Sequence, residues 1–395
     1  MNHPDPRGSV PPRGASLALL VVVSLLCLVA AEATLRLVQP MPLSTGYLSD
    51  EGVPIHVPGL SGVYRRSEFA APVSFNSAGF RDEEFVIPKP GGVLRIVALG
   101  DSMTEGLQVS DDDLFTRQIE ILAAKDGLAV EVANLGVSGY GTDDAMLAFD
   151  VYGAPLEPDV VIVFFCMNND ARNNLLEGRC SLRDDTLHCD PARPATRAQR
   201  RWRDFRVTFL RPLQLYQRAR GAIHSLGVGD FEATRSLDVG GPGMGFGGLL
   251  HVVPEPENVR NALEITGRLL GELSAHAARA GAETWLVLLP MQHQIEEDRW
   301  RRIADPESGY RVERDRPQRT MRELAAQVPI PVIDLYDAFR ARDAAGERLY
   351  WQTDAHFNEA GHRVTAEMVT ARLREHRTGS PIGRGPASPA PGRTP

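Results

Sequence analysis

The sequence predicts an α/β fold in which a parallel β-sheet of about five strands is covered by helices on both faces. Apolar runs rich in β-branched residues are typical of strands buried on both faces, and the first three of them end in polar loops. Segments with helical periodicity separate these runs, and strands that alternate with helices form parallel sheets. The expected strands span residues 94–99, 129–133, 159–166, 284–290 and 332–335.

The helices are expected on both faces of this sheet, with apolar residues at helical spacing. They span residues 113–126, 142–152, 259–280, 318–327 and 359–376. Segment 172–258 breaks the rhythm, and we interpret it as an insertion over the carboxyl edge of the sheet, part lid and part flexible loop. It contains an arginine-rich stretch at 197–206, a predicted helix at 210–226 and a glycine-rich run at 240–248.

Two features of the insertion allow more than one interpretation. The glycine-rich run has no preceding strand and no Lys-Ser/Thr ending, so we interpret it as a linker rather than a phosphate-binding loop. The arginines form a solvated face or, alternatively, recognise an anionic polymer or head group.

The N-terminal segment predicts a membrane anchor. Residues 1–14 are polar, and residues 15–31 contain no charge. A helix that crosses the bilayer core needs about 20 apolar residues, and roughly 17 at the least, whereas a signal-peptide core has about 7–15. We therefore expect a transmembrane anchor at 15–38, with residues 1–14 in the cytoplasm and the rest of the chain in the periplasm or outside the cell. Because residues 31–33 read Ala-Glu-Ala, a cleaved signal peptide and a secreted protein are the alternative.

Composition marks the remaining boundaries. Residues 39–92 are rich in Pro, Gly and Ser and predict a connector with a small β element, before an enzyme domain at 93–376. Residues 377–395 lack an apolar pattern and predict a disordered tail. The net charge of −8 on 395 residues argues against a nucleic-acid-binding surface.

Two cysteines predict a disulfide. Cys180 and Cys189 flank eight residues of a polar loop, a spacing that suits a hairpin closed by a disulfide in an oxidising compartment. Two free thiols and half of a metal site are the alternatives, and the sequence has no second cysteine pair to complete a metal site. Cys166 lies in an apolar strand and is expected in the core.

Several polar residues at strand ends point to acyl chemistry. Ser102 follows the first strand in an abrupt Gly-Asp-Ser turn, at the edge where α/β proteins bind ligands. Serine becomes a nucleophile when a histidine, held by a carboxylate, takes its proton, and one loop offers Asp354 and His356. The loops after the second and third strands offer Gly139 and Asn169 as donors to an oxyanion. The alternatives are a plain helix cap at the serine and a cap or surface pair at the Asp-x-His loop.

These residues resemble the motif blocks of a known family, the SGNH (GDSL-type) hydrolases, which carry Ser, Gly, Asn and His in this chain order. Residues 100–102 resemble the first block, 136–139 the second, 169–170 the third, and Asp354 with His356 the last. The resemblance implies a flavodoxin-like three-layer α/β/α fold. It also implies hydrolysis or transfer of an ester-linked acyl group, without a metal and without an organic cofactor.

The sequence departs from the family pattern at two blocks. Met167 stands where the third block usually has glycine, which leaves Asn168 and Asn169 as rival donors; we favour Asn169 because an aspartate follows it. In the last block one residue, not two, separates Asp from His, as in some membrane-anchored and acetyltransferase-like relatives. The rival base His362 falls within the final helix and is interpreted as structural.

The resemblance implies ester chemistry, and the N-terminal segment and the cysteine pair predict export, so we expect an exported serine esterase that acts on a carbohydrate or lipid ester through an acyl-enzyme. His356 takes the Ser102 proton and Asp354 orients the imidazole. The N–H groups of Ser102 and Gly139 and the Asn169 amide hold the oxyanion. The alternatives are an O-acyltransferase that modifies an envelope or secreted polysaccharide, and a non-catalytic glycan-binding protein on the same fold. The expected partners are the ester substrate and, through the N-terminal helix, the membrane.

Overall fold

The computed structural model places the chain in two compact units, Met1–Ser44 with Thr196–Ser236, and Thr45–Ala195 with Leu237–Pro395. The structure describes residues 13–38, 45–176, 178–184, 186–225, 245–305 and 309–379. Most of the predicted tail at 377–395 and the first half of the glycine-rich run therefore lie outside the described residues. Each unit is treated by itself below.

The larger unit is built on a five-stranded parallel sheet with the order β13-β11-β7-β5-β6, which confirms the predicted fold class. The strands are β5 (Leu94–Gly100), β6 (Val130–Asn134), β7 (Val160–Cys166), β11 (Glu283–Leu289) and β13 (Val332–Asp334). The strand order reverses between β5 and β7, because the chain moves to β6 and then crosses back. In open α/β sheets, ligands bind at the carboxyl ends of the strands at such a reversal.

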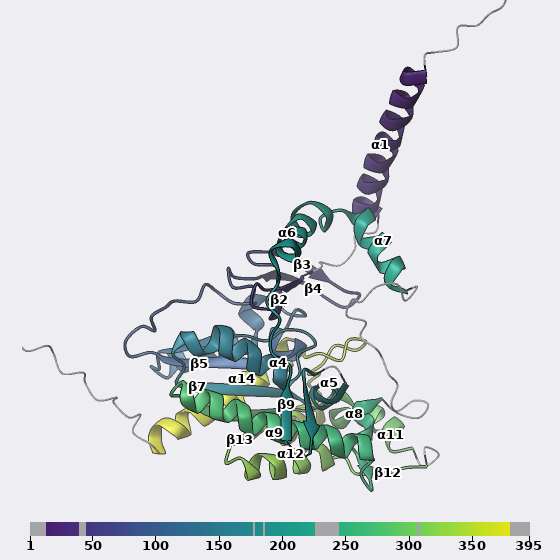
Figure 1. Cartoon of the computed structure of the whole chain (residues 1–395). Helices are drawn as coiled ribbons and strands as arrows, with labels where there is room; N and C mark the ends of the chain where they lie inside the picture. The colour runs from purple at the N-terminus through teal and green to yellow at the C-terminus, as the bar shows by residue number, and fades with distance from the viewer. Residues whose placement is uncertain are drawn as a thin grey trace, which may run out of the picture. The chain divides into compact units, whose positions relative to one another are not determined.

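Side chains on the strands alternate between two cores, one on each face of the sheet. On β5, Val97 and Leu99 join one core, while Ile96 and Ala98 join the other. This period of two with apolar residues on both sides is typical of a sheet covered twice. The two cores place helices on both faces of the sheet, which is the expected three-layer α/β/α arrangement, and Figure 1 shows helices packed around the labelled strands.

The helices divide between the two faces. Side chains of α3 (Phe115–Lys125), α13 (Tyr336–Ala344) and α14 (Glu359–Gly379) pack into one core. Side chains of α4 (Thr142–Ala148), α5 (Asp170–Leu176), α9 (Glu257–Arg279) and α12 (Arg316–Gln327) pack into the other. The short helical turns are α2 (Ser102–Glu105), η1 (Asp111–Asp113), η2 (Phe149–Gly153), η3 (Ala154–Leu156), α10 (Gln292–Ile295) and α11 (Glu297–Ile303).

Residues 45–92, which belong to the segment 39–92 expected as a connector with a small β element, are part of the same compact unit as the sheet. They form two antiparallel pairs: β1 (Gly46–Leu48) with β2 (Pro54–His56), and β3 (Ser61–Arg65) with β4 (Ala70–Ser74). Their few large apolar side chains explain the difference. Val53, Ile55 and Phe80 are fully or almost fully buried and join the core beneath the sheet.

The segment expected as one insertion is divided between the units. In the larger unit it contributes the hairpin β8 (Cys180–Arg183) and β9 (Thr186–Cys189), then α8 (Phe246–Leu249) and β10 (Val252–Val253), which pairs with β12 (Arg311–Val312). Cys180 and Cys189 are joined by a disulfide with an S–S distance of 2.03 Å, and Cys166 is buried, as expected. The hairpin is thereby closed at its open end.

The smaller unit contains α1 (Arg13–Val38), α6 (Arg197–Phe205), η4 (Arg206–Leu210) and α7 (Gln214–Ser225). In α1, the stretch Leu17–Val38 is long and apolar enough to cross a membrane, by length and composition alone, a test that a signal sequence also passes. Thr196 begins α6 with a reciprocal cap, because its hydroxyl accepts from Gln199 N and the Gln199 side chain accepts from Thr196 N.

Candidate active site

Ser102 stands at the first position of α2, immediately beyond the end of β5. Asp101 precedes it as the helix cap, with its Oδ1 accepting from Met103 N at 2.9 Å. Gly100 makes the sharp turn feasible, because a Cβ there would lie 2.2 Å from Thr104 Oγ1 and 2.9 Å from the Phe164 carbonyl. The N–H groups of a first helical turn have no partner within the helix, so Ser102 presents a hydroxyl and a backbone donor together.

The structure brings His356 to Ser102 although 254 positions separate them. His356 Nε2 lies 2.8 Å from Ser102 Oγ, within hydrogen-bond distance. The other ring nitrogen, Nδ1, hydrogen-bonds to Asp354 Oδ1, and the same oxygen accepts from His356 N at 3.2 Å. With one residue between them, Asp354 and His356 can therefore both join Ser102 in a hydrogen-bonded hydroxyl–imidazole–carboxylate chain.

Asp354 and His356 each stabilise the charged form of the other. Burial would lower the pKa of His356, but the hydrogen bond and charge of Asp354 outweigh it, so the pKa is raised above 6.5. Burial would raise the pKa of Asp354, but its hydrogen bonds to His356 and the charge of the imidazole lower it below 3.8. The carboxylate thus stays ionised, and the imidazole is a stronger base than a free histidine.

Glu68, in the turn between β3 and β4, holds the loop that carries Asp354 and His356. Its Oε1 accepts from Gln352 N at 2.8 Å, and its Oε2 accepts from Thr353 N at 2.7 Å and Asp354 N at 3.1 Å. The hydrogen bond from the Thr353 hydroxyl contributes most to lowering the pKa of Glu68. Sequence reasoning missed this residue, because a glutamate in a polar turn carries no pattern that links it to a loop nearly 300 residues later.

Gly139 and Asn169 lie in the loops that follow β6 and β7, the strands flanking β5. Gly139 has φ +85° and is exposed, with open space where a Cβ would project. Asn173 Nδ2 donates to the Gly139 carbonyl at 3.1 Å, so α5 fixes this loop. The Asn169 amide lies against the Asp101 carboxyl group, whose burial raises its pKa while Met103 N and Asn169 oppose the rise.

Asn168, the rival donor, faces a different part of the molecule. It is exposed, and a Cβ on Gly247 of α8 would lie 2.7 Å from Asn168 Oδ1. Asn169 is half-buried and neighbours the residue that precedes Ser102. This placement favours Asn169 over Asn168 as the donor that can reach a group bound to Ser102.

His362, the rival base, is 1% exposed and packs inside the larger unit. Its Nδ1 accepts from Phe115 N at 3.2 Å, and its ring stacks on the Phe115 ring with centroids 5.4 Å apart. Burial lowers the pKa of His362 to about 3, so the ring is neutral at pH 7. These contacts agree with the structural role expected from the sequence.

Glu105, at the end of α2, ties the serine helix to the Gly139 loop. Its Oε2 accepts from Ser138 N at 2.7 Å, and its Oε1 lies 2.9 Å from His56 Nε2. Burial would raise the pKa of Glu105, but His56 and Ser138 lower it, so the carboxylate is ionised inside the protein. Sequence reasoning passed over Glu105 and His56; the signal available was an acidic residue one turn after the serine.

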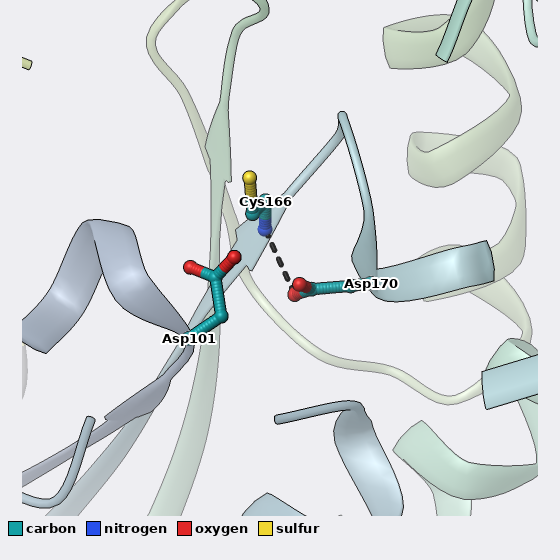
Figure 2. A group of neighbouring side chains, drawn as sticks. All are labelled: Asp101, Cys166 and Asp170. Atoms are coloured by element: carbon teal, nitrogen blue, oxygen red, sulfur yellow. Dashed lines mark hydrogen bonds between the residues drawn. The ribbon is translucent and has the colours of Figure 1, made fainter. Parts of the chain in front are cut away.

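A cluster of buried side chains includes Asp101, the residue before Ser102. Figure 2 shows Asp101, Cys166 and Asp170 as neighbours, with Asp170 Oδ2 accepting from Cys166 N at 2.9 Å. Their ligand atoms lie within 4.8 Å of one another, a spacing that could hold a metal ion. Burial raises the pKa of all three groups, and that of Asp170 well above 3.8, so the surroundings favour the protonated form of Asp170 most strongly.

Two cavities in the larger unit lie away from these residues. One of about 570 Å³ is lined by side chains of β6 and α3, and one of about 330 Å³ opens near the amino ends of β5 and β6. Ser102 and His356 line neither cavity. The candidate active site is therefore identified by the hydrogen-bonded chain of Ser102, His356 and Asp354 at the carboxyl ends of the strands, and not by either cavity.

A family comparison agrees with the strand-end residues. The model of the GDSL-like lipase/acylhydrolase family matches residues 98–364, which is more than half of the chain and includes Ser102, Gly139, Asn169 and His356. The chain belongs to this family. As a GDSL-like acylhydrolase, it is an ester-bond hydrolase. No curated protein matches the acylhydrolase chain.

Solved structures similar to the acylhydrolase are distant in sequence. The acetyl xylan esterase AlAXEase is 13% identical, with 71% of this chain and 99% of that chain covered and a TM-score of 0.38. The lipase/acylhydrolase from Enterococcus faecalis is 17% identical, with 71% and 96% covered and a TM-score of 0.38. The esterase EstA from Pseudoalteromonas sp. is 9% identical, with 72% and 100% covered and a TM-score of 0.37.

Proposed function

We propose that this acylhydrolase is an exported serine esterase that works through an acyl-enzyme, with Ser102 as nucleophile. The observation that carries the proposal is the 2.8 Å contact between Ser102 Oγ and His356 Nε2, with Asp354 bound to the other ring nitrogen. A serine hydroxyl becomes nucleophilic when such a base takes its proton. The raised pKa of His356 suits it to that step.

In the first half-reaction, His356 Nε2 takes the Ser102 proton while Oγ bonds to the acyl carbon. The carbonyl oxygen becomes an oxyanion, for which the N–H groups of Ser102 and Gly139 and the Asn169 amide are the proposed donors. The imidazolium then gives its proton to the leaving alcohol as the ester C–O bond breaks. Asp354 stabilises the imidazolium and holds its tautomer.

In the second half-reaction, water attacks the acyl-enzyme, His356 takes a proton from it, and the carboxylic acid leaves as Ser102 regains its hydrogen. The proposed substrate is an acyl ester of a carbohydrate or lipid. If a polysaccharide hydroxyl replaces water, the same residues transfer the acyl group, which makes an envelope O-acyltransferase the second candidate. The candidate membrane span found among the described residues supports that alternative, because it would hold the enzyme at the envelope.

Two observations support export. The disulfide between Cys180 and Cys189 is a bond that persists in oxidising compartments. The apolar helix α1 is compatible with a membrane anchor or a signal peptide. We accordingly propose the unit Thr45–Ala195 with Leu237–Pro395 as the catalytic domain, on the outer side of the membrane.

The test is covalent labelling with a fluorophosphonate. The wild type and Ser181→Ala, a control at an exposed serine of the β8–β9 hairpin, should label, and Ser102→Ala should not. Unchanged labelling of Ser102→Ala would remove the proposed nucleophile. Turnover of aryl esters with and without a polysaccharide acceptor then separates the two functions, since acylated acceptor forms only in a transferase.

A further inference from the structure

Unit Met1–Ser44 with Thr196–Ser236 contains a helical segment with one apolar face that the catalytic chemistry does not use. From Arg197 to Leu210, α6 and η4 follow without a break. Ala198, Trp202, Phe205 and Phe209 recur at spacings of four, three and four, which places them on one side of a helix. Aromatic residues dominate this side.

The aromatic side faces outward. The exposed fractions are 58% for Trp202, 45% for Phe205 and 61% for Phe209. Their rings form a continuous stripe, with centroids 5.8 Å apart for Trp202 and Phe205 and 5.3 Å apart for Phe205 and Phe209. By contrast, the side chain of Arg203 is only 11% exposed. Contiguous exposed apolar surface marks an interaction site rather than an ordinary solvated face.

Arginines accompany the stripe. Residues 196–225 contain eight arginines and one acidic residue, Asp204, in a chain whose net charge is −8. Aromatic rings beside basic side chains are the composition of helices that lie in a membrane interface, where rings enter the head-group layer and guanidinium groups meet lipid phosphates. The charge selects an anionic lipid surface.

Within the same unit, hydrogen bonds join this segment to the candidate membrane span, and this set of contacts is called the clip below. Glu32 of α1 accepts from Gln214 N at 2.9 Å and Leu215 N at 3.0 Å, at the start of α7. Arg36 donates to the Pro212 carbonyl at 2.9 Å and pairs with Glu32 at 2.7 Å. The turn between η4 and α7 is therefore fixed to the last turns of α1.

The position of the clip along α1 determines how deep in the bilayer the clipped turn lies. Glu32 follows the uncharged run at 15–31 directly. At 1.5 Å per residue that run is about 26 Å long, close to the hydrocarbon thickness of a bilayer. Glu32 and Arg36 consequently stand where α1 leaves the apolar core, and the clipped turn lies at the level of the head groups.

We infer that the stripe of Trp202, Phe205 and Phe209 is a membrane-interface surface that binds the head-group layer of an anionic phospholipid bilayer beside α1. It follows that α1 is a retained part of the folded protein, because a cut near residues 31–33 would separate it from the clip. The membrane is then held at two elements, a span and a surface helix.

Depth-dependent quenching in nanodiscs tests the inference. The full-length protein is reconstituted in phosphatidylcholine with or without phosphatidylglycerol, using acyl chains brominated near the head group or near the chain end. Of the four tryptophans, Trp202 should account for most of the quenching, strongest with shallow bromines and with the anionic lipid. Trp202→Phe should lose that component, and Trp300→Phe, in the larger unit, should keep it.

Variants that remove positive charge test the preference for anionic lipid. Replacing the exposed Arg197 and Arg201 by Gln should reduce the increase in quenching that phosphatidylglycerol produces, and added salt should do the same. Quenching equal in wild type and Trp202→Phe overturns the inference. So does a Trp202 emission that changes with an anionic polysaccharide but not with lipid, or a Trp202→Phe variant whose main effect is to dissociate a dimer.

Discussion

Replacing Asn169 by Ala, with Asn168→Ala as the matched control, tests the oxyanion site where the sequence leaves two neighbours in competition. The structure separates them: Asn169 lies against Asp101, next to Ser102, while Asn168 faces Gly247. Asn169→Ala removes an amide that can donate to the oxyanion. Asn168→Ala removes a side chain that points to α8.

The magnitude follows from how many donors remain. With the Ser102 and Gly139 N–H groups still in place, the loss of one of three donors should lower kcat by about 10²–10³, equivalent to about 2.7–4 kcal/mol of barrier. KM should change little, because the negative charge develops only in the transition state. Asn168→Ala should leave kcat within a few-fold of the wild type.

Initial rates with a series of p-nitrophenyl esters measure kcat and KM for both variants, and thermal unfolding checks that each is folded. The unfolding control matters because Asn169 also opposes the rise in the pKa of Asp101. Equal rates for the two variants would refute the assignment of the third donor. A larger loss with Asn168→Ala would move the assignment to the other asparagine.

Three further outcomes are expected from the site. Glu68→Ala should lower kcat and leave the melting temperature almost unchanged, because the carboxylate holds the loop of Asp354 and His356. Equal kcat for variant and wild type would contradict this. In a pH–rate profile, kcat/KM should rise with pH through a pKa above 6.5, since only the neutral ring of His356 accepts a proton; a plateau already reached at pH 6 would contradict it. The raised pKa stabilises the folded state below pH 6.5, and this contribution is lost as the pH rises through the folded value. EDTA should leave activity unchanged, because the proposed steps use Ser102, His356 and Asp354 and no metal ion; a loss restored by one metal would contradict this.

The sheet and its order along the chain could be predicted because its strands obey strict local rules. Each has apolar residues on both faces, and β5, β6 and β7 end before loops that carry polar residues. Strand β5 shows this most clearly, with the apolar run ending at Gly100 before the Asp-Ser pair. Patterns of this kind depend on neighbours in sequence, so no tertiary information was needed to recognise them.

The support around the site could not be predicted, because its contacts join segments far apart. Glu68 acts on a loop 284–286 positions away, and His56 meets Glu105 inside the protein. Residues 45–92 have the composition of a connector, yet they supply both side chains and bury Ile55 and Phe80 in the main core. Composition reports how flexible a segment is when alone, and it says nothing about the surface that the segment meets.

The insertion shows a different limit. Its arginine-rich stretch is interpreted from the sequence as a solvated face, or alternatively as a binder of anionic groups, with nothing to decide between them. The decision requires the exposure of Trp202 and Phe209 and the contacts of Glu32 with α7, neither of which a helical pattern specifies. An amphipathic helix looks the same in sequence whether its apolar face packs inward or outward.

Carboxylates near Ser102 have two opposite effects on the proposed reaction, because they stabilise an imidazolium and destabilise an oxyanion. Burial lowers the pKa of His356, but the hydrogen bond and charge of Asp354, helped by the charge of Glu105, raise it and so stabilise the imidazolium that forms when the serine is deprotonated. The same charge would oppose an oxyanion on the substrate. Burial counters this by raising the pKa of Asp170 well above its usual value, so one acid of the buried pair holds a proton, while His56 lies against Glu105. The negative charge nearest the base is thereby kept on Asp354, on the side of the imidazole away from Ser102.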